Sequence, residues 1–304
     1  MENLACSIAA VILTKNEERH IARCIHSLQG VCTEIWVIDS FSTDQTCQIA
    51  EELGAKVVQH TWKNYATQFN YAVYQCPIQA DWIWRIDADE FLEGNLGESV
   101  KYALAHCDDD NVNGVYVRKR IDFMGKSLLH GGWYPSYHLK IFRKGHGDCE
   151  NRWMDEHIRL FDGTAITVCE GNQVDDNLND LTWWTEKHNG YATREMVDML
   201  MMEYGLDAKA QEVVPRFWGT EEQRKRWLKL KYIQTPLFIR PFINFFLRYI
   251  LRGGFLDGKE GFVWHILQGF WYRMLVDAKI FELKKRFGYD RERIKSYLIN
   301  NYLT

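Results

Sequence analysis

The sequence lacks the cysteine pairs and glycine-rich loops that identify several large protein classes. Its eight cysteines are scattered, with no Cys-X-X-Cys pair, so neither a zinc site nor a disulfide framework is indicated, and a reducing cytoplasm fits. It has no Gly-X-Gly-X-X-Gly and no Gly-Lys-Ser/Thr run, which excludes the usual dinucleotide and triphosphate cradles. No basic region precedes the apolar run at residues 8–13 and no small-residue cleavage site follows it, so we interpret this run as a strand rather than a signal peptide.

The amino-acid composition favours a globular protein, and its charges are unevenly distributed along the chain. The 304 residues are 46% hydrophobic and include only 5 prolines, which suits one large domain or two smaller ones. Residues 1–214 hold 19 Lys and Arg against 33 Asp and Glu, a net charge of −14, whereas residues 215–304 hold 18 against 8, a net charge of +10. The basic part fits a polyanionic surface, and we expect an anionic membrane surface and no nucleic acid; the alternative is a basic helical surface packed on the acidic body.

The most informative stretch is an apolar run that ends in three carboxylates, Trp82-Ile83-Trp84-Arg85-Ile86-Asp87-Ala88-Asp89-Glu90. The run is too short for a helix and suits a buried parallel strand. Residues two apart can turn both carboxylates to one side, so Asp87 and Asp89 could hold a hard divalent cation that keeps its other positions for water and phosphate. Acidic triplets also occur in surface turns, where Asp is favoured for local hydrogen bonds.

Strand and helix signals alternate before this stretch. Strands are predicted at residues 8–13, 34–39, 56–59 and 82–86, and helices at 17–28, 44–53 and 65–75. This order implies a parallel sheet with right-handed crossovers. Because parallel strands share a carboxyl end, Asp39 and Asp87 are expected at the same edge of that sheet, where open α/β folds bind their ligands.

Four motifs follow one another along this part of the chain: Val11-Ile12-Leu13-Thr14-Lys15-Asn16-Glu17, the run from Val37 to Thr46, Gln68-Phe69-Asn70-Tyr71-Ala72, and Asp87-Ala88-Asp89-Glu90. In this order they resemble the motifs of the family 2 glycosyltransferases of the GT-A fold. The match covers roughly residues 7–190 and looks most like bacterial enzymes that extend lipopolysaccharide cores or lipid-linked glycans. It implies an α/β GT-A fold with a mixed, mainly parallel sheet, plus a C-terminal helical region.

The resemblance also implies a nucleotide-sugar donor, either a UDP-sugar or a GDP-sugar, with a divalent metal, Mg²⁺ or Mn²⁺, on its diphosphate. The nucleotide-binding positions that it implies are Thr14, Asn16, Glu17, Asp39, Gln68, Asn70 and Asp87. Asp89 would hold the metal together with Asp87. The second motif differs from the family pattern, since Ser40 replaces an acid and Phe41 and Gln45 replace two glycines. We therefore expect a less open nucleotide loop.

An acidic pair, Asp155 and Glu156, provides the candidate base. Inverting transfer needs a carboxylate that takes the proton of the acceptor hydroxyl, and the resemblance implies the same role. We prefer Glu156, with Asp155 as the alternative. His157 could complete the metal site or orient a carboxylate, or it could be a structural histidine.

Two further groups could contact the acceptor or the diphosphate. Trp133 and Tyr134 lie beside glycines and are either a platform for a sugar ring or core residues. Lys187, His188 and Arg194 recur near one face of a predicted helix, where they would either neutralise the diphosphate or form a solvated face with neighbouring glutamates.

The tail has its own pattern. The run from Pro236 to Leu251 is strongly apolar, but it is short and contains two arginines, so an interfacial helix suits it better than a transmembrane one. A second apolar series at helical spacing follows, from Phe262 to Phe281. We predict a GT-A catalytic domain at 1–214 and an amphipathic, membrane-associating region at 215–304, which would place the protein in the cytoplasm on the inner leaflet. A packed bundle or a homo-oligomer interface is the alternative.

Taken together, the motifs predict metal-dependent, inverting transfer of a sugar from a nucleotide-sugar to a hydroxyl of a lipid-linked or lipopolysaccharide-type glycan. A sugar-nucleotidyltransferase is one alternative, although such enzymes usually have a Gly-rich basic loop after the first strand, which Thr14-Lys15-Asn16-Glu17 is not. A non-catalytic membrane scaffold is the other, and it would bind metal and nucleotide-sugar without turnover.

Overall fold

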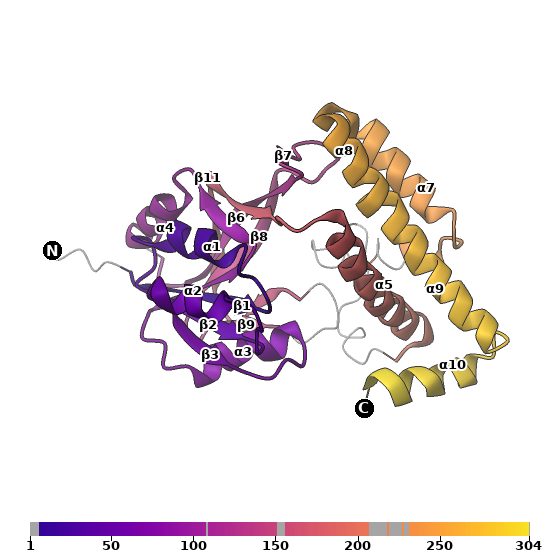
Figure 1. The fold of residues 1–304 in the computed structure, drawn as a ribbon, viewed down its shortest axis with the longest axis horizontal. Helices are drawn as coiled ribbons and strands as arrows, with labels where there is room; N and C mark the ends of the chain where they lie inside the picture. Colours follow the sequence, from indigo (N-terminus) through magenta and orange to yellow (C-terminus); the bar gives the residue numbers. More distant parts are fainter. Residues whose placement is uncertain are drawn as a thin grey trace. The chain divides into compact units, whose positions relative to one another are not determined.

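The computed structural model describes residues 6–107, 109–150, 156–206, 218, 227 and 231–303. The chain forms two compact units, Met1–Leu178 and Asn179–Thr304 (Figure 1). This division falls before the long helix α5 (Leu181–Tyr204), whereas the sequence predicts a boundary at residue 214. The reason is packing, since the buried apolar residues of α5 share a core with the C-terminal helices.

A mixed sheet forms the centre of the first unit, and its path through the described residues is β3-β2-β1-β4-β8-β6-β11-β5, with β7 paired to β6. β1 pairs parallel with β2 and β4, β2 pairs parallel with β3, and β8 runs antiparallel to both β4 and β6. A two-stranded sheet, β9 and β10, lies beside it. The strands are β1 (Ile8–Thr14), β2 (Glu34–Asp39), β3 (Lys56–Gln59), β4 (Trp82–Asp87), β5 (Glu90–Glu93), β6 (Val112–Phe123), β7 (Lys126–Ser127), β8 (Ser136–Arg143), β9 (Gly147–Cys149), β10 (Ile158–Leu160) and β11 (Thr164–Asp176).

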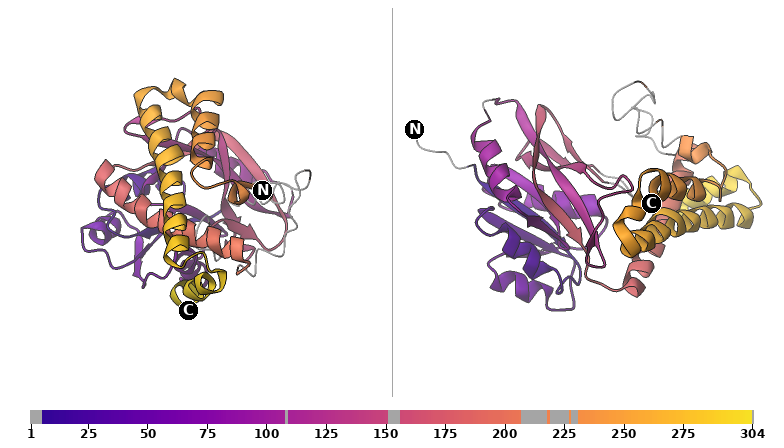
Figure 2. Two further views of the ribbon diagram at one scale, coloured as in Figure 1. Left: turned by 90° about the vertical axis from the view of Figure 1, so that its right-hand side faces the viewer. Right: turned by 90° about the horizontal axis from the view of Figure 1, so that it is seen from above.

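Helices cover both faces of this sheet (Figure 2). β1 is buried along its whole length, and its residues alternate between two cores because successive side chains of a strand point to opposite faces. Val11 packs with α3 (Tyr65–Gln75) in one core. Ile12 packs with α1 (Ile21–Leu28) and α2 (Thr46–Glu52) in the other. A third core holds α4 (Leu96–Ala105). This arrangement confirms the predicted α/β fold.

The register brings the strand ends together. Thr14 of β1 pairs with Asp39 of β2, and Leu13 pairs with Asp87 of β4. The carboxyl ends of β2 and β4 therefore flank the end of β1, as the parallel topology predicts. The loops that follow these three strands form the rim on which the candidate site is built.

The second unit is helical. One core joins α5 to α9 and α10, and α7 lies alongside the α8–η4–α9 helix in both Figure 1 and Figure 2. Three of the described segments, η2, η4 and η5, are π-helical. No helix among the described residues is long and apolar enough to cross a membrane. The remaining elements are α7 (Arg240–Phe245), η2 (Phe246–Leu251), η3 (Gly254–Asp257), α8 (Gly258–Trp264), η4 (His265–Trp271), α9 (Tyr272–Arg286), α10 (Arg291–Leu298) and η5 (Ile299–Leu303).

Candidate active site

Hydrogen bonds around Asp39 join the ends of β1 and β2. Asp39 is fully buried, and its carboxylate accepts hydrogen bonds from Thr14 Oγ1 (2.9 Å), the Ser42 amide (2.8 Å) and Ser42 Oγ (2.5 Å). Burial acts to raise the pKa of this carboxyl, but the hydrogen bonds from Ser42 and Thr14 outweigh it and hold the pKa below its usual value. Thr14 and Asp39 thus shape the two loops, and the nucleotide contact predicted for them stays a prediction.

The loop after β1 is cross-linked to the loop after β2. The Thr43 amide donates to Asn16 Oδ1 (2.8 Å), and the Asn16 amide donates to Ser42 Oγ (2.8 Å). Phe41, at one of the two glycine positions of the family pattern, has φ 59°, a left-handed conformation that glycine adopts more easily. Lys15 Nζ donates to the Phe41 carbonyl (2.5 Å) and helps to hold this strained turn. The backbone therefore keeps the shape that a glycine would allow, while the Phe41 side chain is exposed.

Glu17 is anchored through a buried histidine. His20 Nδ1 and Glu17 Oε2 are 2.7 Å apart, and the Leu178 amide donates to His20 Nε2 (2.9 Å). Because Nε2 accepts a hydrogen bond, the ring carries its proton on Nδ1 and donates it to Glu17. This chain of contacts fixes the first loop against the end of the first unit.

The amides of Gln68 and Asn70 are both used within the protein. Gln68 is fully buried and donates to Ser40 Oγ (3.1 Å) and to the His60 carbonyl (3.1 Å). Asn70 donates to the Cys149 carbonyl (2.8 Å) and accepts from the Cys149 amide (2.9 Å). These two residues therefore support the loop after β2 and tie β9 to α3, while the nucleotide-binding role that the resemblance implies for them stays a prediction.

The two acids of the metal motif lie at the end of β4. Asp87 keeps 31% of its side chain exposed and accepts a hydrogen bond from the Tyr65 hydroxyl (2.5 Å). Asp89 is half-buried, and its Oδ2 accepts from Asn177 Nδ2 (2.9 Å). Arg85 Nε donates to the same Tyr65 hydroxyl (2.8 Å). Each carboxylate thus accepts a hydrogen bond from a neutral donor, and Asp87 Oδ2 also lies 3.9 Å from Lys140 Nζ.

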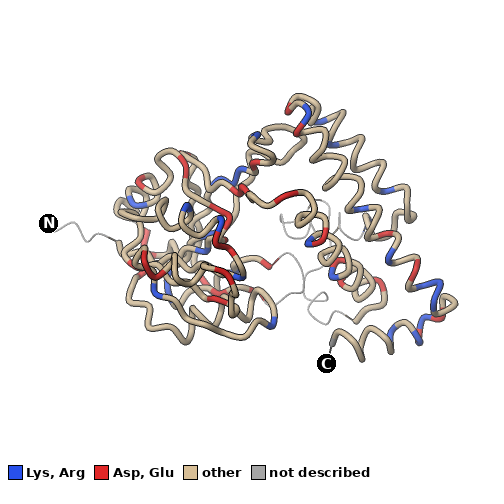
Figure 3. The backbone as a smooth tube through the Cα atoms, in the orientation of Figure 1, with Lys and Arg blue, Asp and Glu red and all other residues tan. Residues whose placement is uncertain are grey.

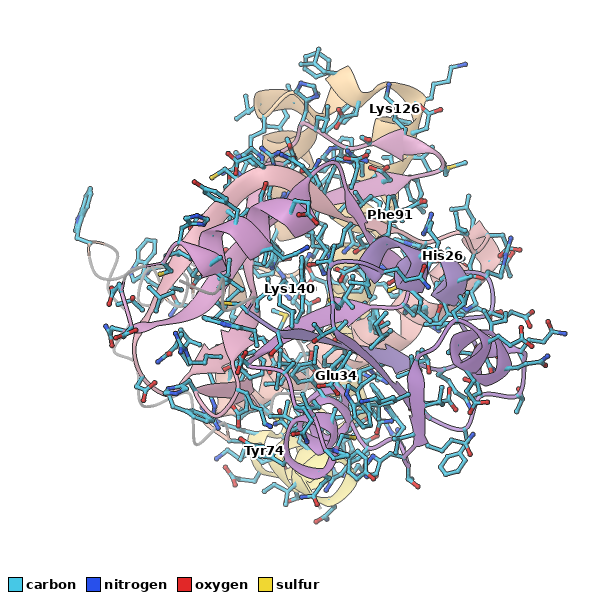
Figure 4. All side chains as sticks on the ribbon, turned by 90° about the vertical axis from the view of Figure 1, so that its left-hand side faces the viewer. His26, Glu34, Tyr74, Phe91, Lys126 and Lys140 are labelled. Carbon is cyan, nitrogen blue, oxygen red and sulfur yellow. The ribbon has the colours of Figure 1, made fainter. Side chains whose placement is uncertain are left out.

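A buried charge network lies directly beneath this motif. Glu90 is fully buried and is paired with Lys140 (3.0 Å) and Lys119 (3.0 Å), and it accepts from Gln173 Nε2 (2.5 Å). Burial acts to raise the pKa of Glu90, but Lys140 and Lys119 outweigh it and hold the pKa well below its usual value. Figure 4 shows Lys140 among the strands of the sheet, in agreement with its exposure of 6%. The sequence does not single out these lysines, because their strands contain further charged residues, such as Arg118 and Arg120 beside Lys119 and Arg143 near Lys140.

Replacing Glu90 tests this network. We expect Glu90→Gln to lower the free energy of unfolding by about 3–5 kcal/mol at neutral pH, because two buried ammonium groups lose a charged partner. The folded-state pKa of Glu90 lies below its unfolded value, so ionised Glu90 stabilises the fold above about pH 4.3. That stabilisation is lost as the pH falls through the folded-state pKa, and the gap between the two proteins should narrow in acid. Urea unfolding measured between neutral and acidic pH would show this.

The matched control for this prediction is Glu98→Gln. Glu98 pairs with a lysine three residues away, but 70% of its side chain is exposed. We expect a change in the free energy of unfolding of less than about 1 kcal/mol. Equal effects of the two substitutions would contradict a stabilising role for the buried pairs.

Glu156 is connected to the same strand end through its backbone. Arg85 NH1 donates to the Glu156 carbonyl oxygen (2.7 Å), and the Arg85 guanidinium stacks on the Tyr65 ring at 4.1 Å from its centroid. Burial acts to lower the pKa of Arg85, but its charged and hydrogen-bonded neighbours, Tyr65 first, outweigh burial and raise it. Asp155, the alternative base, lies outside the described residues.

The two carboxylates at the end of β4 suit a cation bound to a diphosphate. A small hard divalent cation is usually held by one or two carboxylates, with substrate phosphates and water in its other positions. Asp87 and Asp89 meet that requirement. Within the described part of the chain, no group of three or more His, Cys, Asp or Glu side chains could hold a metal ion, so His157 does not form such a group with these two acids.

Trp133 and Tyr134 lie in the first unit, in the segment before β8. Both are half-buried. The Tyr134 hydroxyl donates to Asn172 Oδ1 (3.2 Å), and the Arg118 guanidinium lies 5.5 Å from the Tyr134 ring centroid. Tyr134 is therefore tied to β6 and β11, and a sugar contact for either aromatic residue stays a prediction.

Lys187, His188 and Arg194 lie on α5, in the second unit. The His188 ring stacks on Trp184 with centroids 3.5 Å apart, and its Nδ1 lies 2.8 Å from the Trp184 carbonyl oxygen. Lys187 Nζ lies 4.4 Å from the Trp183 ring centroid, and the Arg194 guanidinium lies 5.7 Å from the Tyr191 ring centroid. These cationic or polar groups thus cover aromatic rings of their own helix, and their predicted contact with the diphosphate stays a prediction.

The chain is similar to several known proteins. The family model for glycosyl transferase family 2 matches residues 9–161. An uncharacterized glycosyltransferase of Rickettsia conorii is 42% identical over 274 residues, which are 88% of this chain and 88% of that protein. The lipopolysaccharide core biosynthesis glycosyltransferase LpsC of Rhizobium meliloti is 27% identical over 282 residues, 90% of this chain and 92% of that protein. A solved glucosyl-3-phosphoglycerate synthase from Mycobacterium tuberculosis, with Mn²⁺, UDP and glucosyl-3-phosphoglycerate, is 23% identical, with a TM-score of 0.31, over 38% of this chain and 44% of that chain.

Proposed function

Because the chain belongs to the family 2 glycosyltransferases, we propose that it transfers a sugar, with inversion, from a nucleotide-sugar to a hydroxyl of a lipid-linked or lipopolysaccharide-type glycan. The placement of Asp87 and Asp89 at the carboxyl end of β4, beside the loops that follow β1 and β2, is the observation that supports this most directly. Open α/β sheets bind their ligands at this edge. The printed name of the LpsC relative supports an acceptor of the lipopolysaccharide type.

The donor would lie across the loops after β1, β2 and β4. Asn16 is exposed and Glu17 is half-buried on the first loop, so their polar groups are the ones that can face a nucleoside. Thr14, Asp39 and Gln68 hold these loops in place from below. Asn70 fixes β9 against α3. A preformed rim lowers the entropy lost when the nucleotide binds.

Asp89, with Asp87, would hold a divalent cation, Mg²⁺ or Mn²⁺. When bound, such an ion neutralises charge on the donor diphosphate and so stabilises the leaving group. The hydrogen bond from Asn177 orients the Asp89 carboxylate. The hydrogen bond from Tyr65 orients the Asp87 carboxylate.

The base in this proposal is Glu156, with Asp155 as the alternative. The carboxylate takes the proton of the acceptor hydroxyl while its oxygen bonds to the anomeric carbon from the face opposite the diphosphate. The bond between that carbon and the phosphate oxygen breaks, and the nucleoside diphosphate leaves with the electron pair. Arg85 holds the backbone of Glu156 and the Tyr65–Asp87 pair at once, so it links the base to the donor side of the site.

A donor screen tests the proposal. Full-length protein is titrated with UDP-sugars and GDP-sugars, with and without Mn²⁺, while thermal shift and release of the sugar are measured. We expect one nucleotide-sugar to raise the melting temperature in a cation-dependent way and to be consumed slowly in the absence of acceptor. Release of pyrophosphate from a nucleoside triphosphate and a sugar phosphate would indicate a nucleotidyltransferase instead. Binding without any turnover, with lipid-linked glycans also supplied, would indicate a scaffold.

A further inference from the structure

The helix formed by α7 and η2 carries an unusual apolar face. Seven large apolar residues, six of them on this helix and Ile239 directly before it, are between 40% and 65% exposed, at the three- and four-residue spacing of one helix face. They are Ile239, Phe242, Ile243, Phe246, Leu247, Ile250 and Leu251. We call this set the apolar stripe. A helix surface that faces water is normally polar, so we expect the stripe to be buried against another surface.

The polar residues of the same helix point inward. Arg240 is 2% exposed and forms an ion pair with the fully buried Asp277, whose Oδ1 accepts from Arg240 Nε (2.6 Å). Asn244 Nδ2 donates to the Gly269 carbonyl oxygen (2.7 Å). Arg248 is half-buried, and burial, with Arg252 and Arg273, lowers its pKa to about 10. Turning the helix over would leave Asp277 buried without its charged partner, so the outward position of the stripe is fixed by the fold.

The apolar surface continues beyond the helix and has two exposed basic residues at its border, with the half-buried Glu260 beside one of them. Phe255 and Leu256, in the turn after the helix, are 49% and 60% exposed, and Phe262 on α8 is 45% exposed. Arg252 and Lys259 are exposed on either side of these turn residues, whereas the acidic Asp257 is 3% exposed. Figure 3 shows both basic and acidic residues near the turn that joins η2 to α8.

We propose that the apolar stripe, with Phe255 and Leu256, inserts into the interface of an anionic lipid bilayer, and that Arg252 and Lys259 contact its phosphate groups. A helix of twelve residues is about 18 Å long, shorter than the roughly 30 Å hydrocarbon core, so it lies in the plane of the membrane. Basic residues beside an exposed aromatic and aliphatic surface complement an anionic leaflet better than they complement a second, equally basic copy of the unit. This inference rests on the proposed function. A lipid-linked acceptor lies at a membrane, and binding through the apolar stripe would hold the protein there.

Vesicle binding tests the proposal without donor or acceptor, so its failure would leave the transferase activity untouched. Full-length protein is sedimented with vesicles of phosphatidylcholine alone or mixed with phosphatidylglycerol. We expect binding to the mixed vesicles, weaker at high salt. The double substitution Phe246→Ser and Leu251→Ser should weaken binding by roughly 10²-fold, since both side chains would enter the lipid. Tyr289→Asn is the matched control, because Tyr289 is 60% exposed in the same unit but lies between α9 and α10; it should bind like the wild type.

The charged part of the surface is tested separately. Arg252→Gln and Lys259→Gln should each weaken binding to anionic vesicles by about fivefold and reduce its salt dependence. Circular dichroism and thermal unfolding establish whether each variant is folded. If the double variant is unfolded, the single substitution Leu251→Ser takes its place. Unchanged vesicle binding by a folded stripe variant, or no binding by the wild type at low salt, would overturn the proposal. A dimer that the stripe variant dissociates, without vesicle binding by the wild type, would assign the surface to a second copy of the chain.

Discussion

Asp89→Asn is expected to lower kcat/KM for sugar transfer by roughly 10²–10³-fold while leaving the protein folded. The charge of a cation on the diphosphate is worth several kcal/mol in the transition state, and each 1.4 kcal/mol is a factor of ten in rate. Asparagine has nearly the same shape, and its carbonyl oxygen can still accept the hydrogen bond that Asn177 donates to Asp89. The loss should therefore appear in the kinetics and in cation-dependent donor binding, with little change in thermal stability.

The matched control is Asp110→Asn, at an exposed position of the first unit. It should behave as the wild type in both assays. Full activity of Asp89→Asn, with or without added Mn²⁺, would remove Asp89 from the proposed metal site. A loss of activity together with a large fall in melting temperature would point to a structural role for the Asn177 contact.

Glu156→Gln is expected to lower kcat by roughly 10²–10⁴-fold with donor affinity almost unchanged, because it removes a general base and leaves the donor loops intact. The structure makes this substitution informative. Arg85 NH1 donates to the Glu156 carbonyl oxygen, a contact that the substitution does not remove, so the backbone of residue 156 should keep its position when the carboxylate is replaced. Transfer under single-turnover conditions, together with donor titration, separates the two effects.

Two comparisons complete this experiment. Glu170→Gln changes an exposed acid on β11 and should leave kcat unchanged. Asp155→Asn addresses the alternative base. An inactive Asp155 variant beside an active Glu156 variant would assign the base to Asp155, and activity in both would make the pair structural.

Much of the first unit follows from local sequence patterns. The predicted strands at residues 34–39 and 56–59 and the predicted helix at 65–75 coincide with β2, β3 and α3. Short apolar runs and crossover helices determine these elements locally, and parallel pairing then places Asp39 and Asp87 at one edge. The predicted helix at 17–28 begins later, at Ile21, because the preceding residues form hydrogen bonds to the loop after β2 instead.

The buried charge network beneath Asp87 and Asp89 could not be predicted from local sequence patterns. Glu90, Lys119, Lys140 and Gln173 come from four different strands, and their pairing depends on strand order within the sheet rather than on spacing along the chain. The division of the structure at Leu178 differs from the predicted boundary at residue 214 for a related reason, because the packing of α5 against α9 determines which unit that helix joins.

The orientation of the tail helix could not be predicted from the sequence either. Its apolar composition predicts a helix with a preference for an interface, but composition does not say which face of the helix turns outward. The buried Arg240–Asp277 pair decides this, and it joins residues that are far apart in the sequence. The same pair explains why Arg248, which belongs to the basic tail, is half-buried and contributes less to the outer surface than Arg252.

The chain on either side of residues 151–155 is fixed to the core of the first unit. Asn70 holds Cys149 through two hydrogen bonds on one side, and Arg85 holds Glu156 through one on the other. Neither attachment uses a side chain of the segment between them. Substitutions at residues 151–154 should therefore leave both attachments in place, so that Cys149 and Glu156 keep their positions while the sequence between them changes.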